Sequence, residues 1–238
     1  MSSLNPRKIV LGCSVLLGLS AMITGCSRPG TPSPAAGYDG AFICSHVSSD
    51  SIFNLFKIDS AFDALALFTN TPGGTVPVFV DSVTINNLPM EIDGDSVGYI
   101  ATDFQGNLNF SAGAQWKVYG ANGIPSFTYN DQTPYPKYLT LPDTISPAAG
   151  YTFPINATVA PGVDSLVVEI EAGTTAAIKG ANSTSSGLNF TPAELSALVP
   201  GDSTLMVLHA FSLNPQTISG KNFAFMKTRV YYKQLIIK

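Results

Sequence analysis

Three residues of this chain could supply nucleophilic catalysis: the thiol of Cys44 and the imidazoles of His46 and His209. Cys44 and His46 fall two positions apart in 41–47, a predicted strand, so both side chains should point to one face. A thiol beside an imidazole can be activated as a nucleophile. No third group that would orient the imidazole can be assigned, and the sequence has no Gly-x-Ser-x-Gly motif. We therefore predict a buried structural thiol, a core position for His209, no catalytic residue and no enzymatic activity.

Aromatic residues crowd into the middle of the chain, where they could stack on the faces of sugar rings. The candidates for such a ligand-binding surface are Trp116, Tyr129, Tyr135 and Tyr138. The last two lie in Pro-broken sequence, which favours exposure, and flat exposed rings are good platforms for stacking. Aromatic side chains are also ordinary strand residues. Packing into a core or a domain interface is the interpretation that we favour.

Metal binding has little support in the sequence. Glu91, Asp93 and Asp95 alternate around a predicted hairpin tip, where their oxygens could gather. Their spacing does not match an EF-hand loop, and the sequence has no cluster of His or Cys residues with the spacing of zinc ligands. We predict a solvated acidic turn, no metal and no cofactor.

Short apolar runs separated by turn residues predict an all-β fold. Typical turn sequences, such as Pro72-Gly73-Gly74 and Asn122-Gly123, lie between the runs. For 61–68 a short helix is the alternative to a strand, because Ala and Leu are good helix formers. The strand spacing predicts two tandem antiparallel β-sandwich domains, residues 41–140 and residues 141–238.

The second predicted domain has the size and strand content of an immunoglobulin-like sandwich. Its sequence predicts a half-buried strand over 165–171, a central strand over 204–213, and two strands joined by a turn over 222–226 and 229–237. Thr191-Pro192-Ala193-Glu194 has the pattern of a capping box with Pro at the first helical position. It predicts one or two helical turns through Leu198.

The N-terminus has the layout of an export signal. Arg7 and Lys8 form a positive n-region, the apolar run 9–23 is short for a membrane span, and small residues precede Cys26. This layout resembles the lipobox of bacterial lipoproteins, whose signal peptidase cuts before a cysteine that carries a diacylglycerol on its sulfur. The resemblance implies that residues 1–25 are removed and that Cys26 is the lipidation site. An ordinary secretory signal is the alternative.

The mature chain should begin with a tether. Residues 26–40 are rich in Pro and small residues, which favours an extended linker between the lipid and the folded part. In Bacteroidetes lipoproteins, an acidic cluster after the cysteine resembles a surface-export signal. This chain lacks that cluster, so the resemblance favours the periplasmic face of the outer membrane over the cell surface.

Most of the mature chain also resembles a group of Bacteroidetes lipoproteins to which no activity is assigned. The similarity rests on four runs: 106–111, 114–118, 124–129 and 190–195. It implies an exported protein with two β-rich domains, and it implies no function.

Seven of the twelve aspartates precede Ser or Thr and then an aliphatic residue or Thr, whereas chance would place Ser or Thr after about two of them. This triplet is similar to the O-glycosylation signal of Bacteroidetes envelope proteins. The implied glycosylation sites are Ser51, Ser60, Ser82, Ser96, Thr144, Ser165 and Ser203. The structural alternative is that Asp-Ser/Thr closes a turn and the next residue opens a strand.

Basic residues are unbalanced near the C-terminus. After Asp202 no acidic side chain accompanies Lys221, Lys227, Arg229, Lys233 and Lys238. Cations on an edge strand discourage aggregation, and we predict that role. A docking face for an acidic partner or an anionic lipid is the alternative.

The overall charge excludes a global basic field for nucleic acid. Removing residues 1–25 takes away Arg7 and Lys8 and no acidic residue, which changes the formal charge from −4 to −6. The sequence therefore predicts a lipid-anchored, non-catalytic binding or structural module of the cell envelope, with a glycan or an envelope protein as partner. The alternatives are an accessory carbohydrate-binding lipoprotein and a hydrolase without a recognisable motif.

Overall fold

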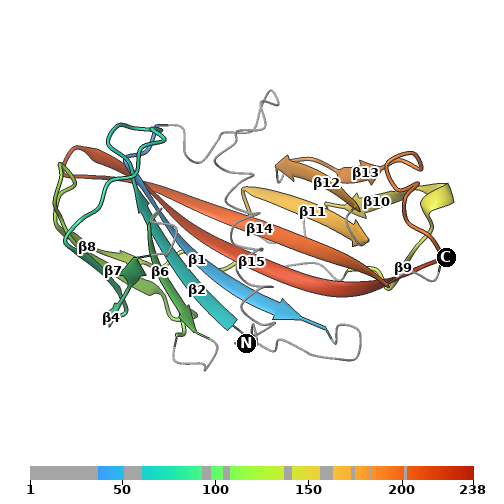
Figure 1. The fold of residues 1–238 in the computed structure, drawn as a ribbon, viewed down its shortest axis with the longest axis horizontal. Coiled ribbons are helices and arrows are strands. Elements are labelled where there is room, and N and C mark those ends of the chain that lie inside the picture. The colour runs from blue at the N-terminus through green and yellow to red at the C-terminus, as the bar shows by residue number, and fades with distance from the viewer. Residues whose placement is uncertain are drawn as a thin grey trace, which may run out of the picture.

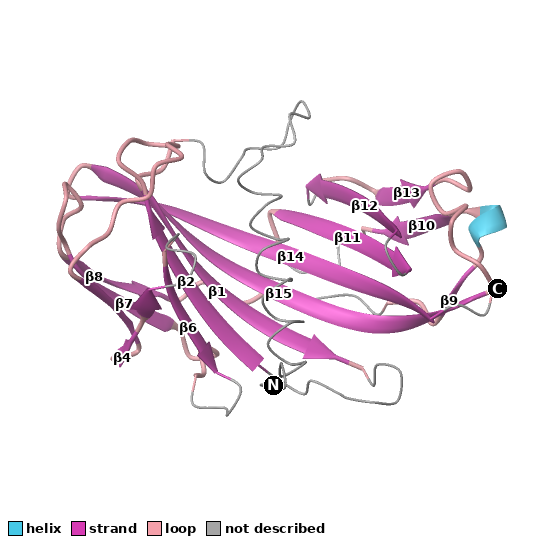
Figure 2. Ribbon diagram, in the orientation of Figure 1, coloured by secondary structure: helices cyan, strands magenta, loops and turns pink. Residues whose placement is uncertain are grey.

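The computed structural model describes residues 37–50, 61–92, 98–103, 108–136, 141–155, 163–172, 175–182, 184–200 and 203–238. These residues form three β-sheets and one short 3-10 turn, η1 (Pro147–Ala149), which confirms the predicted all-β class (Figures 1 and 2). The segment Ala61–Phe68, for which a helix was the alternative, is a strand. No helix among the described residues is long and apolar enough to cross a bilayer.

One large sheet runs through the whole described structure. Its strand order is β12 (Thr175–Asn182), β11 (Ser165–Ala172), β14 (Ser203–Ile218), β15 (Lys221–Ile237), β1 (Gly40–Ser49), β2 (Ala61–Phe68), β6 (Tyr99–Asp103) and β5 (Glu91–Ile92), with β9 (Thr144–Ile145) beside the end of β15. The prediction of purely antiparallel pairing is wrong for β1 and β9, because both run parallel to β15. The first and last long strands of the described chain are therefore neighbours at the middle of the sheet.

Two small sheets cover the large one. One contains β4 (Leu88–Pro89), β3 (Ser82–Ile85), β7 (Ala114–Tyr119) and β8 (Phe127–Asp131), and the other contains β10 (Tyr151–Pro154) and β13 (Gly187–Phe190). Figure 1 shows them towards opposite ends of the long strands. Each encloses an apolar core against the large sheet. The four-stranded sheet covers the first core, which includes Phe42, Phe68, Trp116, Phe223 and Phe225, and the two-stranded sheet covers the second core, which includes Phe153, Val168, Phe190, Leu208 and Leu235.

Strands β14 and β15 form one uninterrupted hairpin. Their ladder runs from Ser203 opposite Ile236 to Ile218 opposite Lys221. The two-residue turn between them has positive φ at both Ser219 (51°) and Gly220 (78°), which is the backbone of a type I′ turn and matches the twist of the strands. The predicted turn between residues 226 and 229 is therefore wrong, because the chain continues there as strand β15.

Both cores lie on one face of the large sheet. In the unbroken strand β15, Phe223 and Phe225 belong to the first core, while Leu235 and Ile237, which alternate in the same phase, belong to the second. The opposite face carries two smaller apolar clusters around Val230 and Met226. The first core thus depends on residues beyond the predicted boundary at 140, and neither separate domains nor an immunoglobulin-like second half is confirmed.

Candidate functional site

The parallel pairing of β1 with β15 gathers ionisable side chains inside the molecule. Cys44 lies opposite Lys227, and His46 lies opposite Arg229. These residues follow Phe42 on β1 and Phe225 on β15 at intervals of two, so all four side chains lie on the same face of the sheet as the first core. Asp131 at the end of β8 and Tyr135 just beyond it approach from the covering sheet. We call the six side chains of Cys44, His46, Asp131, Tyr135, Lys227 and Arg229 the inner polar cluster.

A completely buried ion pair occupies the centre of the inner polar cluster. The Nζ of Lys227 lies 3.4 Å from Oδ2 of Asp131, and the two side chains are 0% and 1% exposed. The backbone N–H of Thr133 donates to Oδ1 of Asp131 at 3.0 Å. Within the described residues, Nζ and Oδ2 make no contact that has the geometry of a hydrogen bond. The Nζ of Lys227 also lies 5.3 Å from the centroid of the Tyr135 ring.

Cys44 remains a thiol in this environment. It is completely buried, and burial raises the pKa of the thiol to about 12, although the nearby charge of Lys227 acts in the opposite direction. Because the thiolate is the nucleophilic form, a cysteine of this kind is unreactive at neutral pH. The predicted burial of this thiol is confirmed.

His46 is held as a neutral imidazole. Its Nδ1 lies 2.6 Å from a guanidinium nitrogen of Arg229, and its ring stacks on Phe62 with 4.5 Å between centroids. Burial, followed by the charge of Arg229, lowers the pKa of His46 to about 4. The predicted placement of Cys44 and His46 on one face is confirmed. The imidazole nitrogen that faces Arg229 is occupied, so it cannot accept the proton of the thiol.

His209 lies apart from the inner polar cluster. Its neighbour Ala210 lies opposite Arg229 and shares the face of the inner polar cluster, so His209 faces the other side of the large sheet. There its ring stacks on Phe211. The side chain is buried, and burial lowers the pKa of His209 to about 4. The predicted core position is confirmed.

The candidate sugar-binding aromatics do not form an exposed platform in the described residues. Trp116 is completely buried, and its ring packs edge-on against Phe42. Tyr129 is half-buried, and its hydroxyl accepts a hydrogen bond from Nδ2 of Asn214 at 2.8 Å. Tyr135 is half-buried in the inner polar cluster. Tyr138 lies outside the described residues.

The C-terminal cations do not lie on an edge strand, so that prediction is wrong. Strand β15 is central in the large sheet, and its lysines are paired with aspartates. These pairs are Lys221–Asp39 at 2.9 Å, Lys227–Asp131 at 3.4 Å, and Lys233 with Asp143 at 2.7 Å and Asp50 at 3.8 Å. The local excess of positive charge is balanced by acidic residues from earlier in the chain.

The Asp-Ser/Thr triplets have a structural position in common. Four of the predicted glycosylation residues each begin a strand: Ser82, Thr144, Ser165 and Ser203. Ser82 is exposed, whereas Thr144 and Ser165 are half-buried. Oδ2 of Asp164 accepts a hydrogen bond from the backbone N–H of Leu213 at 2.6 Å, so this aspartate ties the start of β11 to the neighbouring strand β14 rather than closing a local turn. Ser51, Ser60 and Ser96 lie outside the described residues, and glycosylation stays a prediction.

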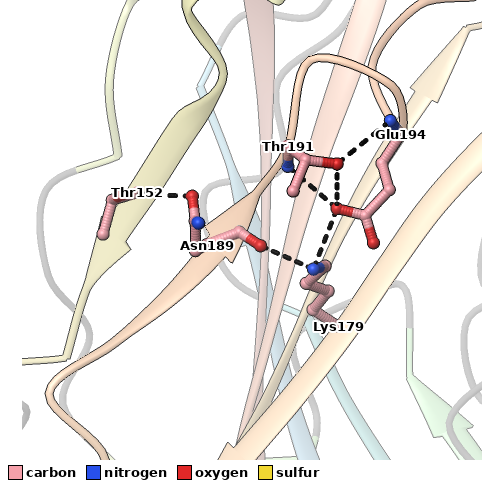
Figure 3. Close-up of polar contacts among 5 residues, drawn as sticks. All are labelled: Thr152, Lys179, Asn189, Thr191 and Glu194. Atoms are coloured by element: carbon pink, nitrogen blue, oxygen red, sulfur yellow. Dashed lines mark hydrogen bonds and ion pairs between the residues drawn. The ribbon is translucent and has the colours of Figure 1, made fainter.

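The predicted capping box forms, but the helix does not. The backbone N–H of Thr191 donates to Oε2 of Glu194 at 2.8 Å, and the N–H of Glu194 donates to Oγ1 of Thr191 at 3.3 Å (Figure 3). Residues 192–197 are hydrogen-bonded turns, because Leu195 bonds back to Thr191 while Leu198 bonds back only to Leu195. Both leucines are buried in the second core, which fixes the segment in this shape.

Lys179 joins this capping box to the neighbouring strand. Its Nζ lies 2.9 Å from Oε2 of Glu194 and donates to the carbonyl of Asn189 at 2.5 Å (Figure 3). The bond from the Thr191 backbone, followed by the one from Lys179, lowers the pKa of Glu194 to about 2. These side chains are fixed among themselves, and we assign them a structural role.

The described residues contain no group of three or more His, Cys, Asp or Glu side chains placed to bind a metal. Cys26, the predicted lipidation site, lies outside the described residues. Comparison with known proteins gives no match to a family, to a curated protein or to a solved structure.

Proposed function

We propose that the protein is an exported, lipid-anchored and non-catalytic module of the outer membrane, which holds its C-terminal part away from the bilayer as a binding or structural element. The observation that carries this proposal is the joint between the start of β1 and the β14–β15 turn. Asp39 accepts hydrogen bonds from Nζ of Lys221 and from the backbone N–H of Asn222, both at 2.9 Å. Its own N–H donates to the carbonyl of Asn222 at 2.7 Å.

This joint sets the direction in which the molecule extends from its tether. The predicted tether, residues 26–40, ends at Asp39 and Gly40, whereas β14 and β15 run on for 16 and 17 residues. At about 3.3 Å per residue such strands cover roughly 50 Å. The C-terminus and the β10–β13 sheet lie towards the other end of these strands (Figure 1). An anchor at Cys26 would therefore leave the second core distal to the membrane.

The continuity of the sheet favours a spacer over a flexible pair of domains. Strands β14 and β15 contribute to both cores, so bending between the cores would break the β14–β15 ladder. Two finer expectations belong to the proposal: an immunoglobulin-like arrangement of residues 141–238 and a glycan or an envelope protein as the ligand of the distal end. Carbohydrate binding by the predicted aromatics is not favoured, because Trp116 is completely buried.

Metabolic labelling with a palmitate analogue tests the anchor. The full chain with a C-terminal tag should incorporate the label, and Cys26→Ala should lose it. Cys44→Ala is the matched control and should keep the label, because this thiol is completely buried. Equal labelling of wild type and Cys26→Ala would refute the proposed anchor.

Protease accessibility tests the compartment. Digestion of the tagged protein in intact cells would place the distal end on the cell surface. Protection in intact cells, with digestion after lysis, would place it in the periplasm. Digestion behaviour identical to that of a cytoplasmic protein under both conditions, together with recovery in the soluble cytoplasmic fraction, would contradict export.

A further inference from the structure

An amine and a carboxyl group are in contact at the centre of the inner polar cluster, where both are sealed from water. Lys227 comes from β15 of the large sheet and Asp131 from β8 of the covering sheet, so the contact spans the first core. Nζ and Oδ2 are 3.4 Å apart, and each side chain is at least 99% buried. Neither atom has a partner with hydrogen-bond geometry in the described part of the chain. This is an unusual state for two ionisable groups, since buried charges are normally hydrogen-bonded as well as paired.

The surroundings of the pair are largely aromatic, and the other charged member of the inner polar cluster, Arg229, is bonded to His46. Phe225 precedes Lys227 on the same face of β15, and Tyr129 precedes Asp131 on the same face of β8, with their ring centroids 4.0 Å apart. The ring of Tyr135 lies beside Nζ. Cys44 and Tyr135 keep their protons at neutral pH, because burial raises the pKa of both groups. Asp131 is the carboxyl group that the structure places in contact with Nζ of Lys227.

Such an environment favours an uncharged product over an ion pair. Two isolated charges are costly to keep out of water, and an amide carries none. Groups held in contact by a fold react as if at very high concentration, with effective molarities of about 10⁵–10⁸ M for well-oriented pairs. Exclusion of water also removes the reagent that would hydrolyse the product.

We propose that Lys227 and Asp131 condense to an intramolecular amide that links the large sheet to the four-stranded sheet. The ammonium first returns a proton to the carboxylate, which gives a neutral amine and a carboxylic acid. The nitrogen lone pair then attacks the carboxyl carbon, so that a C–N bond forms and the C–OH bond breaks. The hydroxyl leaves with the second amine proton as one water molecule. No oxidant, reductant or other reactant is consumed.

The bond would have a definite mechanical consequence. It would close a covalent loop from β8 to β15 and hold the covering sheet on the first core even when the core is partly unfolded. Restricting the unfolded chain in this way stabilises a fold, as disulfides do, and this chain has no cysteine pair available for that purpose inside its described part. The inference is independent of the proposed lipid anchor and of the compartment.

Peptide mapping of the denatured full-length protein tests the proposal. Trypsin should leave Lys227 uncut and should join residues 118–137 to residues 222–229 in one branched peptide, lighter than the two linear peptides together by the mass of one water. Fragmentation should locate the branch at Asp131 and Lys227. Recovery of the linear peptide 118–137 with normal cleavage at Lys227 would overturn the proposal.

Lys221 and Asp39 provide an internal control. Their Nζ–Oδ1 distance is 2.9 Å, shorter than that of the buried pair, but the Lys221 side chain is 33% exposed and the contact is hydrogen-bonded. Trypsin should therefore cut after Lys221. A second branched peptide at this pair would contradict the role assigned to water exclusion.

Lys227→Arg separates the covalent bond from the ion pair, because a guanidinium keeps the charge but does not attack a carboxyl group. This variant should give only linear peptides and should unfold at a lower temperature than the wild type. A variant as heat-stable as the wild type would contradict the proposed bond. If the variant does not fold, the wild-type peptide map still decides the proposal.

Discussion

Arg229 lies directly opposite His46 in the parallel ladder of β1 and β15, and its guanidinium nitrogen lies 2.6 Å from Nδ1 of the imidazole. A guanidinium can only donate, so Nδ1 must present its lone pair and the ring must be neutral. The histidine that sequence reasoning placed beside Cys44 is thus bonded to an arginine 183 residues away. Its protonation would set two cations against each other inside the fold.

Acid should therefore destabilise the protein, beginning near pH 6.5. The pKa values of His46 and His209 are lowered from 6.5 to about 4, mainly by burial. As the pH falls below 6.5, both histidines become protonated in the unfolded chain but stay neutral in the folded chain. The contribution of both histidines is fully present above pH 6.5 and is lost as the pH falls towards 4. The limiting slope of the two histidines alone is about 2.7 kcal/mol per pH unit, and Glu169, whose pKa burial raises to about 7, subtracts about half of it between pH 5 and pH 6.5. Urea denaturation between pH 8 and pH 5 would measure it.

Single substitutions measure how much each histidine contributes to the pH dependence of the free energy of unfolding. His46→Gln and His209→Gln should each lower the slope above pH 5 by about 1.4 kcal/mol per pH unit, because each removes one proton that the unfolded chain binds and the folded chain does not. Glu169 also titrates in this range, because burial, followed by the neighbouring Glu171, raises its pKa from 4.5 to about 7. It opposes the histidines by about one proton, equally in the wild type and in both variants, so the differences between them still report the histidines. A slope that both variants leave unchanged would show that other groups cause the acid sensitivity.

The joint at Asp39 should be important for stability. Its buried carboxylate holds Lys221 and the backbone N–H of Asn222 at the β14–β15 turn. Asp39→Ala leaves these donors without their acceptor and should lower the free energy of unfolding by about 1–3 kcal/mol. Asp81→Ala, on an exposed turn, is the matched control and should change it by less than about 0.5 kcal/mol. Equal effects of the two substitutions would contradict the proposed joint.

The capping box should contribute modestly to the second core. Thr191→Ala removes the acceptor for the N–H of Glu194 and the hydroxyl that donates to its carboxylate at 2.9 Å. The expected loss is about 0.5–1 kcal/mol, measured by thermal unfolding. Thr152→Ala, whose hydroxyl makes only a 3.4 Å contact with Asn189, should have no measurable effect. A larger loss for Thr152→Ala than for Thr191→Ala would reverse the assignment.

The ionisation of Glu194 gives the same network a second test. The pKa of Glu194 is lowered from 4.5 to about 2, so its stabilising contribution is present above pH 4.5 and is lost as the pH falls towards 2. Glu194→Gln should thus reduce the thermal midpoint at pH 7 and leave it nearly unchanged near pH 2. A difference that persists unaltered at pH 2 would contradict a role for the carboxylate charge.

Local sequence was a good guide to strands and a poor guide to pairing. Alternation in 165–171 and the apolar run 204–213 correspond to β11 and β14, because both patterns report which faces are buried. The pairing of β1 with β15 could not be predicted, because β15 lies at the other end of the chain and the residues of a strand do not indicate which strand pairs with it. The immediate neighbours of a residue contain no information of that kind.

The inner polar cluster was missed although the sequence contained a signal for it. Lys227 alternates in phase with Phe223 and Phe225, and Asp131 alternates in phase with Phe127 and Tyr129. Each charged residue therefore lies on the apolar face of its strand. A lysine and an aspartate in such positions are expected to be buried and paired with each other. The charges at 227 and 229 instead suggested a turn, because charged residues are usually exposed. Tertiary pairing overrode that local preference.

A chain that ends at residue 140 should not fold by itself. It would lack β15, which is the neighbour of β1 in the large sheet and supplies Phe223 and Phe225 to the first core. It would also leave Asp131 buried without Lys227, and a buried charge that loses its partner costs about 3–5 kcal/mol. Circular dichroism and one-dimensional NMR of residues 27–140 should show no cooperative thermal transition, whereas residues 27–238 should show one. A cooperative transition in the shorter chain would mean that the predicted N-terminal domain is independent and that β15 only extends its sheet.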